Sequence, residues 1–428
     1  MVLKNRWLRL LAVLFSLSLV AAACSSSGSD DDGDQADTDQ DGGGGGTLEP
    51  TAGFDGETIT LGYITDQSGP FAALGIPLVE GAQVWVDWLN DQGGIAGQYP
   101  VELEVADSGY VAQTAIEEYQ RLKDSSAMFA FIIGTPSVNA VLEFLEEDDV
   151  TAVPGTQDGR WYDFPVLLPV AVPYQIQMIN GADWYVNEMG STDDVACVLR
   201  QDDEYGEAGL AGVEFAAGEL GFDVAVETTY AADDTEYTAQ VTELSDAGCE
   251  VVYMVSGARQ TNAFLTEASE LGFSPTYVGA FPSQAFLFIT PDSAALYENF
   301  YMVNTGPQYG DTSVAGMADY LDRQATYGEG EGDTFTLTGY TSMLPVGQLL
   351  EQAVADGDLG RAGLQTSMTQ LGEIDLEGLG AAPTYNSDGS RDIPRTSVIF
   401  KADPSVAGSS MAFVTEWSSD AAEAFDFG

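Results

Sequence analysis

The chain has 428 residues, with 68 acidic and 13 basic side chains, no histidine and a formal net charge of −55 at neutral pH. This balance argues against nucleic acid and anionic lipid headgroups as partners, because binding phosphates needs a basic surface. The absence of histidine excludes Ser-His-Asp and Cys-His catalysis and histidine metal sites. Neither GxGxxG after a strand nor GxxxxGK[ST] occurs, which argues against nucleotide binding through these loops.

The first 24 residues have the layout of a targeting segment. Lys4, Arg6 and Arg9 precede an apolar stretch at 10–20, which is too short to span a bilayer as a helix. Three alanines then lead directly into Cys24. This order resembles the lipobox of bacterial lipoproteins and implies that residues 1–23 are a signal peptide and that Cys24 is lipidated. An ordinary signal peptide with a nearby cysteine is the alternative.

Residues 24–56 have the composition of a disordered acidic tether. The segment is rich in Asp, Ser and Gly and has almost nothing apolar to bury, so it cannot offset the entropy lost on ordering. The DTDQDG run at 37–42 matches the start of a calcium loop, but Leu48 stands where such a loop needs a glutamate. We therefore expect no metal site here.

From residue 58 onward, apolar strand-like runs alternate with amphipathic helical runs. We expect strands at 59–64, 101–105, 129–133 and 150–153, and helices at 78–90, 112–123 and 138–146. This alternation predicts an α/β unit in which a parallel sheet has helices on both faces.

The pattern begins again after a crossing segment at 167–174. We expect helices at 175–189, 206–220, 236–247 and 261–271, and strands at 195–199, 224–228, 251–255 and 276–278. The fold class is therefore α/β, with two Rossmann-like lobes, parallel central sheets and several hinge crossings. Ligands of such sheets bind at the carboxyl ends of the strands.

Two cysteines remain beside Cys24, and both have apolar neighbours. Cys197 and Cys249 either form a disulfide, as an exported protein allows, or are two small buried side chains. Cys197 falls inside a predicted strand and Cys249 falls just before another. This places them at different heights along the sheet and favours free thiols, because a disulfide needs close Cβ atoms.

Three loops after the first-lobe strands carry small hydroxyl residues and glycines. They are TDQSGP at 65–70, GTPS at 134–137 and PGTQ at 154–157. Free N–H groups and hydroxyls at helix starts suit a carboxylate or a carbonyl oxygen. Each loop alone is typical of a helix cap, whereas three at neighbouring strand ends indicate a binding site.

The body resembles the type I periplasmic solute-binding lipoproteins of ABC importers, in the leucine/isoleucine/valine-binding group. The similarity is carried by SGPFAALG at 68–75, EGAQVWVDWLNDQGGIAG at 80–97, DDEYGEAGLAG at 202–212, the run at 229–254 and YNSDGSR at 385–391. It covers residues 57–428 and, with the lipobox and tether, is of an actinobacterial type. It implies a first lobe at 57–170, completed by 304–384, and a second at 171–303, completed by 385–428.

The resemblance implies a monomeric, lipid-anchored protein outside the cell that has no cofactor and delivers a small amino acid, amide or organic acid to a permease. A sensor that passes the ligand signal to a membrane partner is the alternative. A hydrolase that uses a pair of carboxylates is a weaker one.

The resemblance also implies the ligand-binding residues. Ser137 donates to a ligand carboxylate, residues 155–157 add further contacts, and Ser68 lies at the cleft mouth. Tyr205 either packs over the solute or merely opens a helix, and Trp161 either walls the pocket or lies in the core. The full set is Ser68, Gly69, Thr135, Ser137, Gly155, Thr156, Gln157, Trp161, Tyr205 and Phe281.

One position departs from the amino-acid-binding members. They hold the ligand ammonium with a carboxylate after the strand equivalent to 276–278, whereas this chain has GAFP at 279–282. An unpaired ammonium in a closed cleft is costly. Either Asp158 or Asp203 substitutes, or the ligand is not an α-amino acid and Phe281 contacts an apolar part of it.

Overall fold

Buried strands with side chains on alternate faces build the sheet of the first lobe. The computed structural model describes residues 48–427, and there a four-stranded parallel sheet has the order β2–β1–β3–β4. Tyr63 of β1 faces one hydrophobic core and Ile64 faces the other. The strands are β1 (Ile59–Thr65), β2 (Val101–Asp107), β3 (Phe129–Ile133) and β4 (Ala152–Gly155).

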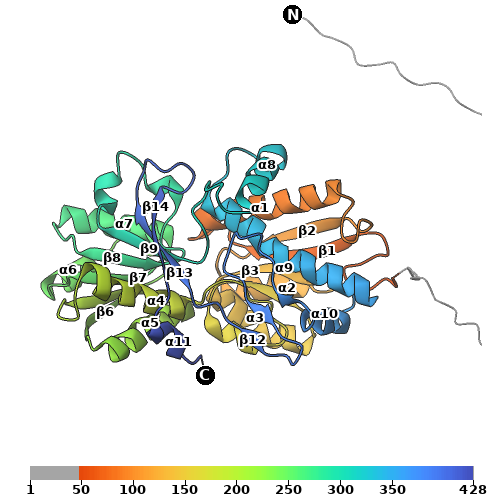
Figure 1. The fold of residues 1–428 in the computed structure, drawn as a ribbon, viewed down its shortest axis with the longest axis horizontal. Helices are drawn as coiled ribbons and strands as arrows, with labels where there is room; N and C mark the ends of the chain where they lie inside the picture. Colours follow the sequence, from red (N-terminus) through yellow and green to blue (C-terminus); the bar gives the residue numbers. More distant parts are fainter. Residues whose placement is uncertain (1–47, 428) are drawn as a thin grey trace, which may run out of the picture. The chain divides into compact units, whose positions relative to one another are not determined.

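Helices cover both faces of this sheet. Helices α2 (Ala112–Leu122) and α3 (Thr135–Glu147) contribute to one core, and α1 (Ala72–Asp91) and α9 (Thr334–Asp356) contribute to the other. Figure 1 shows α9 lying beside α1 although the chain has passed through the second lobe between them. Helices α8 (Met317–Tyr327) and α10 (Arg361–Met368) complete this lobe.

Two glycines let α1 and α9 approach closely. A Cβ atom at Gly81 would lie 1.8 Å from the carbonyl oxygen of Thr336, and one at Gly339 would lie 2.0 Å from that of Leu78. The two backbones therefore touch at these points, which no other residue type allows. This contact fixes the helix pair that the candidate site uses as a wall.

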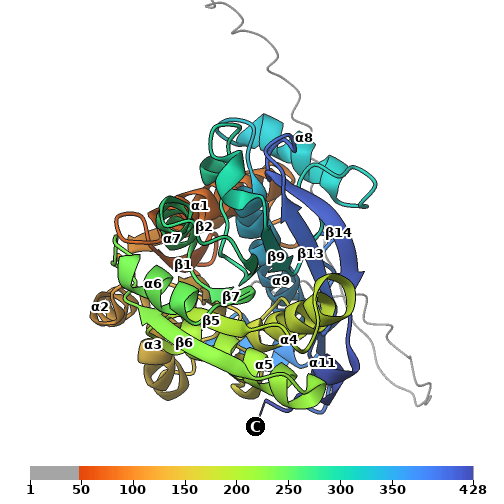
Figure 2. The same ribbon diagram turned by 90° about the vertical axis from the view of Figure 1, so that its left-hand side faces the viewer.

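The second lobe has a seven-stranded sheet of order β14–β13–β9–β8–β7–β5–β6. Its strands from β6 to β9 are parallel, as expected, and β13 and β14 add an antiparallel edge. The strands are β5 (Ala196–Gln201), β6 (Val224–Tyr230), β7 (Val251–Val255), β8 (Thr276–Ala280), β9 (Phe300–Asn304), β13 (Ser397–Ala402) and β14 (Met411–Trp417). Figure 2 shows this lobe facing the viewer.

The helices of the second lobe lie on both faces of that sheet. They are α4 (Tyr174–Trp184), α5 (Glu204–Leu220), α6 (Thr238–Asp246), α7 (Ala258–Glu270) and α11 (Asp420–Ala424). Helix α4 continues as a wide turn at Tyr185–Met189, and short 3₁₀ turns occur at Gly159–Asp163, Phe286–Phe288 and Ala294–Tyr297. No helix within residues 48–427 is both long and apolar enough to cross a bilayer.

The chain passes between the lobes around residues 168–173, 305–308 and 393–396. A small sheet of β10 (Gly372–Glu373), β11 (Thr384–Tyr385) and β12 (Arg391–Asp392) belongs to the first lobe. There the Tyr385 hydroxyl donates to the carbonyl of Pro169 at 2.6 Å. The return to the second lobe thus follows β12, whereas the resemblance implies a return near residue 385.

The folded body begins earlier than composition indicates. Phe54 was assigned to the tether, yet it is 2% exposed and its ring packs edge-on against Tyr99 at 5.2 Å. An aromatic side chain gains by burial even within a polar stretch, so at least residues 51–56 are part of the body. The expected signal peptide, Cys24, the 37–42 run and most of the tether lie outside the described residues.

Cys197 and Cys249 form a disulfide, with Cα atoms 5.9 Å apart, so the expectation of free thiols was wrong. Cys197 lies in β5, as predicted, and Cys249 precedes β7, its neighbour in the sheet. Glu250 donates its backbone N–H to the carbonyl of Val195 at 2.9 Å, which extends the pairing of the two strands toward Cys249. Strand boundaries alone did not reveal this extension.

We predict that a Cys197→Ala/Cys249→Ala variant unfolds with a free energy about 2–5 kcal/mol lower than the natural chain, the usual cost of losing a native disulfide. The disulfide joins residues 52 positions apart, so it removes many conformations from the unfolded chain. Denaturant titration with and without reductant measures the difference. Reductant should destabilise the natural chain and leave the variant unchanged; equal effects on both would contradict the prediction.

Candidate functional site

A cavity lies between the lobes, close to the crossings, and encloses about 910 Å³ of space, including the part that opens to solvent. Leu74 and Leu78 of α1 and Leu337 of α9 line its first-lobe side. Tyr174 at the start of α4 and Phe281 after β8 line its second-lobe side. The paired helices α1 and α9 thus form one wall, and the strand ends and crossings form the rest.

Among the residues that the structure describes, no charged side chain lines this cavity. Most lining groups are aliphatic or aromatic, and the polar ones are hydroxyls, side-chain amides and backbone groups. A charged ligand group buried here has no counter-ion, which is costly unless hydrogen bonds compensate. The cavity therefore suits a mainly apolar solute whose polar end is satisfied by hydrogen bonds.

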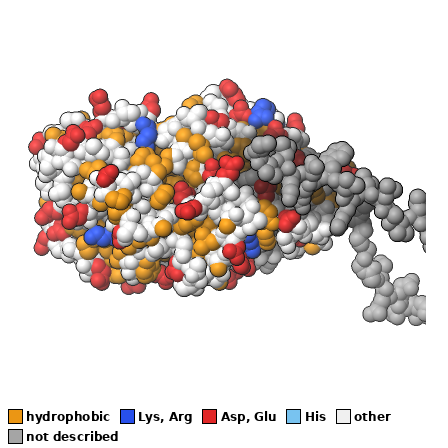
Figure 3. Space-filling view, turned by 90° about the horizontal axis from the view of Figure 1, so that it is seen from above, with side chains coloured by type: hydrophobic (Ala, Val, Ile, Leu, Met, Phe, Trp, Pro, Cys, Tyr) orange, Lys and Arg blue, Asp and Glu red, His pale blue; other side chains and the backbone are white. Residues whose placement is uncertain are grey.

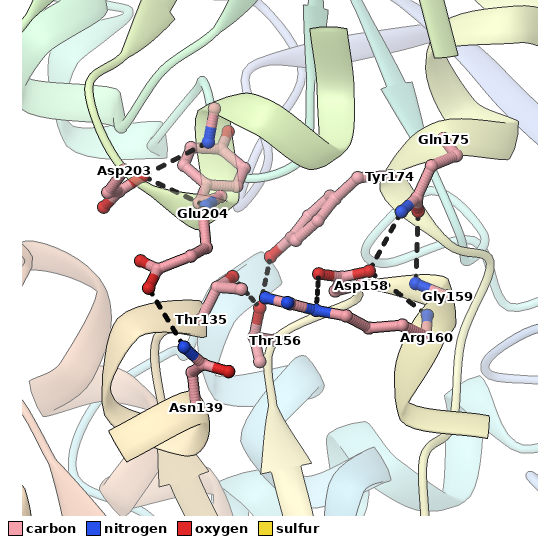
Figure 4. Close-up of polar contacts among 12 residues, drawn as sticks. Thr135, Asn139, Thr156, Asp158, Gly159, Arg160, Tyr174, Gln175, Asp203 and Glu204 are labelled. Atoms are coloured by element: carbon pink, nitrogen blue, oxygen red, sulfur yellow. Dashed lines mark hydrogen bonds and ion pairs between the residues drawn. The ribbon is translucent and has the colours of Figure 1, made fainter. Parts of the chain in front are cut away.

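The two acids considered for an ammonium group do not line this cavity. Asp158 pairs with Arg160 at 2.6 Å and accepts from the Gln175 amide at 2.9 Å (Figure 4). Asp203 caps the N-terminus of α5 through the backbone N–H groups of Tyr205 and Gly206. Both carboxylates already have partners, so neither substitutes for the missing ammonium ligand.

Four residues expected at the site line the cavity: Gly155, Thr156, Gln157 and Phe281. Thr135 lies behind them, with its hydroxyl 2.5 Å from that of Thr156. These residues lie at strand ends, where the βα loops bring together residues that are distant in sequence.

Ser137, expected to donate to a ligand carboxylate, does not line the cavity. It lies in the first turn of α3, is 1% exposed, and its hydroxyl has no hydrogen-bond partner among the described residues. The loop was placed correctly at the strand end, but its hydroxyl is sealed from the space that a solute can occupy.

Ser68 and Gly69 do not line the cavity either. Their backbone N–H groups donate to the carboxylate of Asp66 at 3.2 and 2.5 Å. The Asp66 carboxylate therefore takes the place at this loop that a ligand anion was expected to take. The Asp66 carboxylate also accepts from the N–H of Phe71 at 2.8 Å. Free N–H groups were expected here, and Asp66 is the reason that they are not free.

Trp161 belongs to the core, which decides between the two alternatives given for it. It is fully buried in the first-lobe cluster that contains α2 and α3, and its ring lies 6.2 Å from that of Phe164. Its position near β4 fits either role in sequence. The short 3₁₀ turn at Gly159–Asp163 directs it inward.

Tyr205 lies one layer behind the cavity wall. It is 3% exposed, its hydroxyl donates to the carbonyl of Ser256 at 3.2 Å, and its ring packs edge-on against Tyr174 at 4.8 Å. Tyr174 is therefore the tyrosine that faces the cavity, and Tyr205 supports it. Sequence analysis missed Tyr174 because it assigned that residue to the crossing.

The Tyr174 hydroxyl is a hydrogen-bond donor in the cavity. Burial raises its pKa to about 12, so it keeps its proton at neutral pH. The Thr156 hydroxyl donates to the Tyr174 oxygen at 3.5 Å, and among the described residues nothing accepts from the phenol itself (Figure 4). The phenol proton is thus available to an oxygen of a solute.

Helix α9 adds threonines that no sequence motif pointed to. Thr334, Thr338 and Thr341 all line the cavity, as expected for positions four and three residues apart on one helix face. The Thr338 hydroxyl donates to the carbonyl of Thr334 at 2.9 Å, whereas the hydroxyls of Thr334 and Thr341 are buried without a partner. No signal in the sequence links this helix to α1, which lies more than 200 residues earlier.

The rims of the lobes also touch each other. Tyr110 of the first lobe donates to the carboxylate of Asp203 at 3.2 Å. Asn139 of the same lobe donates to Glu204 at 3.1 Å (Figure 4). Burial is the main cause that raises the pKa of Asp203 above its usual value. These contacts join the two lobes directly.

Comparison with known proteins identifies relatives that match most of this chain. The family model described as "Periplasmic binding protein" matches residues 58–403. The Leu/Ile/Val-binding protein homolog 7 of Brucella abortus is 22% identical over 304 residues, which are 66% of this chain and 74% of that protein.

Solved structures share the fold. The fatty acid ABC transporter substrate-binding protein from Thermomonospora curvata superimposes with a TM-score of 0.82 at 24% identity, covering 89% of this chain and 97% of its own. A branched-chain amino acid ABC transporter protein from Thermus thermophilus with bound valine has a TM-score of 0.76 at 15% identity, covering 87% and 99%. The family match spans most of the chain and both lobes, and it identifies this protein as a member of the type I periplasmic binding proteins, a family of solute-binding proteins rather than enzymes.

Proposed function

We propose that this protein is the extracytoplasmic solute-binding component of an ABC importer, and that its solute has an apolar body and a carboxylate or carbonyl oxygen but no ammonium group. The observation that carries this proposal is the interlobe cavity, which no charged side chain lines among the described residues. A hydrolase that uses a pair of carboxylates receives no support, because no carboxylate of the described part of the chain lines the cavity.

The lining chemistry favours an acyl compound over an α-amino acid. Leu74, Leu78 and Leu337 offer aliphatic surface, and Phe281 stands beside them, its ring packed edge-on against Phe335 at 5.7 Å. Apolar burial supplies most of the affinity of such pockets, while a few polar groups orient the ligand. The fatty-acid name of the Thermomonospora curvata protein supports this solute class, whereas the valine in the Thermus thermophilus protein represents the other one.

Closure of two lobes around the solute is part of the proposal. The first lobe contributes Gly155, Thr156 and Gln157 to the cavity, and the second contributes Tyr174 and Phe281. A solute that contacts both sets binds the closed state better than the open one, which is the condition for shifting the equilibrium. The rim contacts of Tyr110 and Asn139 also stabilise the closed state.

The proposal also includes the membrane anchor. A lipid on Cys24 followed by a polar, acidic segment would keep the body outside the cell and close to a permease. Acidic side chains are spread over the face of the body that Figure 3 shows, and basic ones are few in the chain. Such a surface supports attachment by lipid rather than by electrostatic adsorption, because anionic headgroups repel it.

We predict that calorimetry with straight-chain acids from butanoate to decanoate finds binding, and that 4-methylpentanoate binds more tightly than leucine. Leucine has the same side chain but would bury an ammonium group without a counter-ion. Tighter binding of leucine would contradict the proposed solute class. Mass spectrometry of molecules released from the unfolded protein provides an independent identification.

We predict that Tyr110→Phe shifts the unliganded protein toward an open form by about 1.5–3 kcal/mol, the usual worth of a hydrogen bond to a charged group. X-ray scattering should then report a larger radius of gyration. Tyr119→Phe is the matched control, because its hydroxyl bonds to Phe144 and Asp148 within the first lobe. Equal radii for the two variants would show that the Tyr110 contact does not hold the lobes together.

We predict that Cys24→Ser releases the protein from the membrane fraction into the soluble fraction or the medium. The reason is that serine offers no thiol for the lipid, while the targeting segment is unchanged. Cell fractionation followed by immunoblotting measures the distribution. Retention of the variant on the membrane would exclude Cys24 as the anchor.

A further inference from the structure

A buried glutamine joins both sides of the cavity. Gln177 of α4 is fully buried. Both N–H groups of its side-chain amide and its amide oxygen have hydrogen-bond partners. Its Nε2 group donates to the carbonyl of Val172 at 2.7 Å and to the Oε1 atom of Gln157 at 2.6 Å, and its own Oε1 atom accepts from the backbone N–H of Phe281 at 3.0 Å. One side chain thus links a crossing, a first-lobe loop and a second-lobe loop.

The chemistry of these partners fixes the orientation of the Gln177 amide. The Val172 carbonyl can only accept a hydrogen bond, and the Phe281 N–H can only donate one. Turning the amide over would place oxygen against oxygen and N–H against N–H. Gln177 therefore has a single satisfied orientation, in which its second Nε2 hydrogen points at Gln157.

The orientation of Gln157 follows from that of Gln177. Because Gln177 presents an N–H group, Gln157 must turn its oxygen toward it, and its own Nε2 group must point elsewhere. Gln157 lines the cavity, and no described residue accepts from its Nε2 atom. That atom is not among the buried atoms that lack a partner, so it is accessible, and it belongs to a residue that lines the cleft.

We propose that Gln177 is a positioning residue that holds the Gln157 amide with its N–H groups toward the solute, and that the pair selects solutes with an oxygen acceptor and rejects solutes with an ammonium group. An N–H donor pairs with a carboxylate or carbonyl oxygen and cannot pair with an ammonium. The phenol of Tyr174 is a second donor at the same cavity. The inference rests on the proposed function and names the residues that give it specificity.

Helix α4 offers a matched control for a purely structural role. Gln175 is also buried, at 8% exposed, and it accepts from the N–H of Gly159 at 3.1 Å and donates to Asp158 at 2.9 Å. It does not line the cavity, and the bonds of its side chain go to Gly159 and Asp158 and not to the Gln157 amide. Replacing it removes a comparable buried amide from the same helix and leaves the amide in the cleft untouched.

The experiment measures binding of hexanoate, 1-hexanol and hexylammonium to the full-length protein by calorimetry. In Gln177→Leu, the preference for hexanoate over hexanol should fall about tenfold, the worth of one hydrogen bond to a charged group. Gln175→Leu should leave this ratio unchanged even where it lowers stability. A ratio that is unchanged in Gln177→Leu, or reduced equally in both variants, overturns the inference.

A second variant decides the matter if Gln177→Leu does not fold. Gln157→Glu keeps an oxygen for the Gln177 N–H group but replaces the cleft donor with a carboxylate. It should lose hexanoate binding and gain hexylammonium binding. If Gln157→Glu still prefers hexanoate, the inference is wrong but the proposed function stands. If the natural protein binds none of the three probes and none of the longer acids, both the proposed function and the inference are wrong.

Discussion

The contact between α1 and α9 determines the shape of the site. It depends on Gly81 and Gly339, where the two backbones approach so closely that a Cβ atom would overlap a carbonyl oxygen. Helix α9 belongs to the part of the chain that has returned from the second lobe, so the wall carrying Leu78 and Leu337 forms only after the whole fold is assembled. The cavity is therefore a property of the complete two-lobed body and not of either half of the sequence.

The surface and the cavity differ in charge, and this difference determines how the cavity selects a solute. The chain has a net charge of −55, yet within residues 48–427 no charged side chain lines the cavity. Acids at the surface remain solvated at little cost, whereas an acid inside an apolar cleft needs a partner. Without charges, affinity depends on the apolar area that the solute buries and on a few donors such as Tyr174 and Gln157, so shape and hydrogen-bond direction carry the selectivity.

The local pattern of apolar residues predicted most helices and strands correctly. The features that it missed depend on contacts between segments far apart in the sequence. Strands such as β3 and β7 have the expected bounds because each is a short apolar run beside turn residues. The antiparallel β13–β14 edge and the role of α9 depend on where the chain returns, which periodicity does not encode. The loop containing Gly155 was located from strand order alone. Trp161 and Ser137 show the limit, because the direction of a side chain depends on turns that sequence patterns do not resolve.

The rim contacts and the cavity contacts have different strengths, and this difference bears on closure. Asn139 is exposed, so solvent competes for its hydrogen bond to Glu204. This contact holds the lobes together only weakly, and thermal motion can break it to admit a solute. The bond from Gln177 to Gln157, by contrast, lies at the cavity and joins the lobes near the crossings. A cleft that is weakly tied at its mouth and firmly ordered near its hinge can open for exchange while keeping its donors in place. The solute then determines the closed population through the contacts that it makes with both lobes.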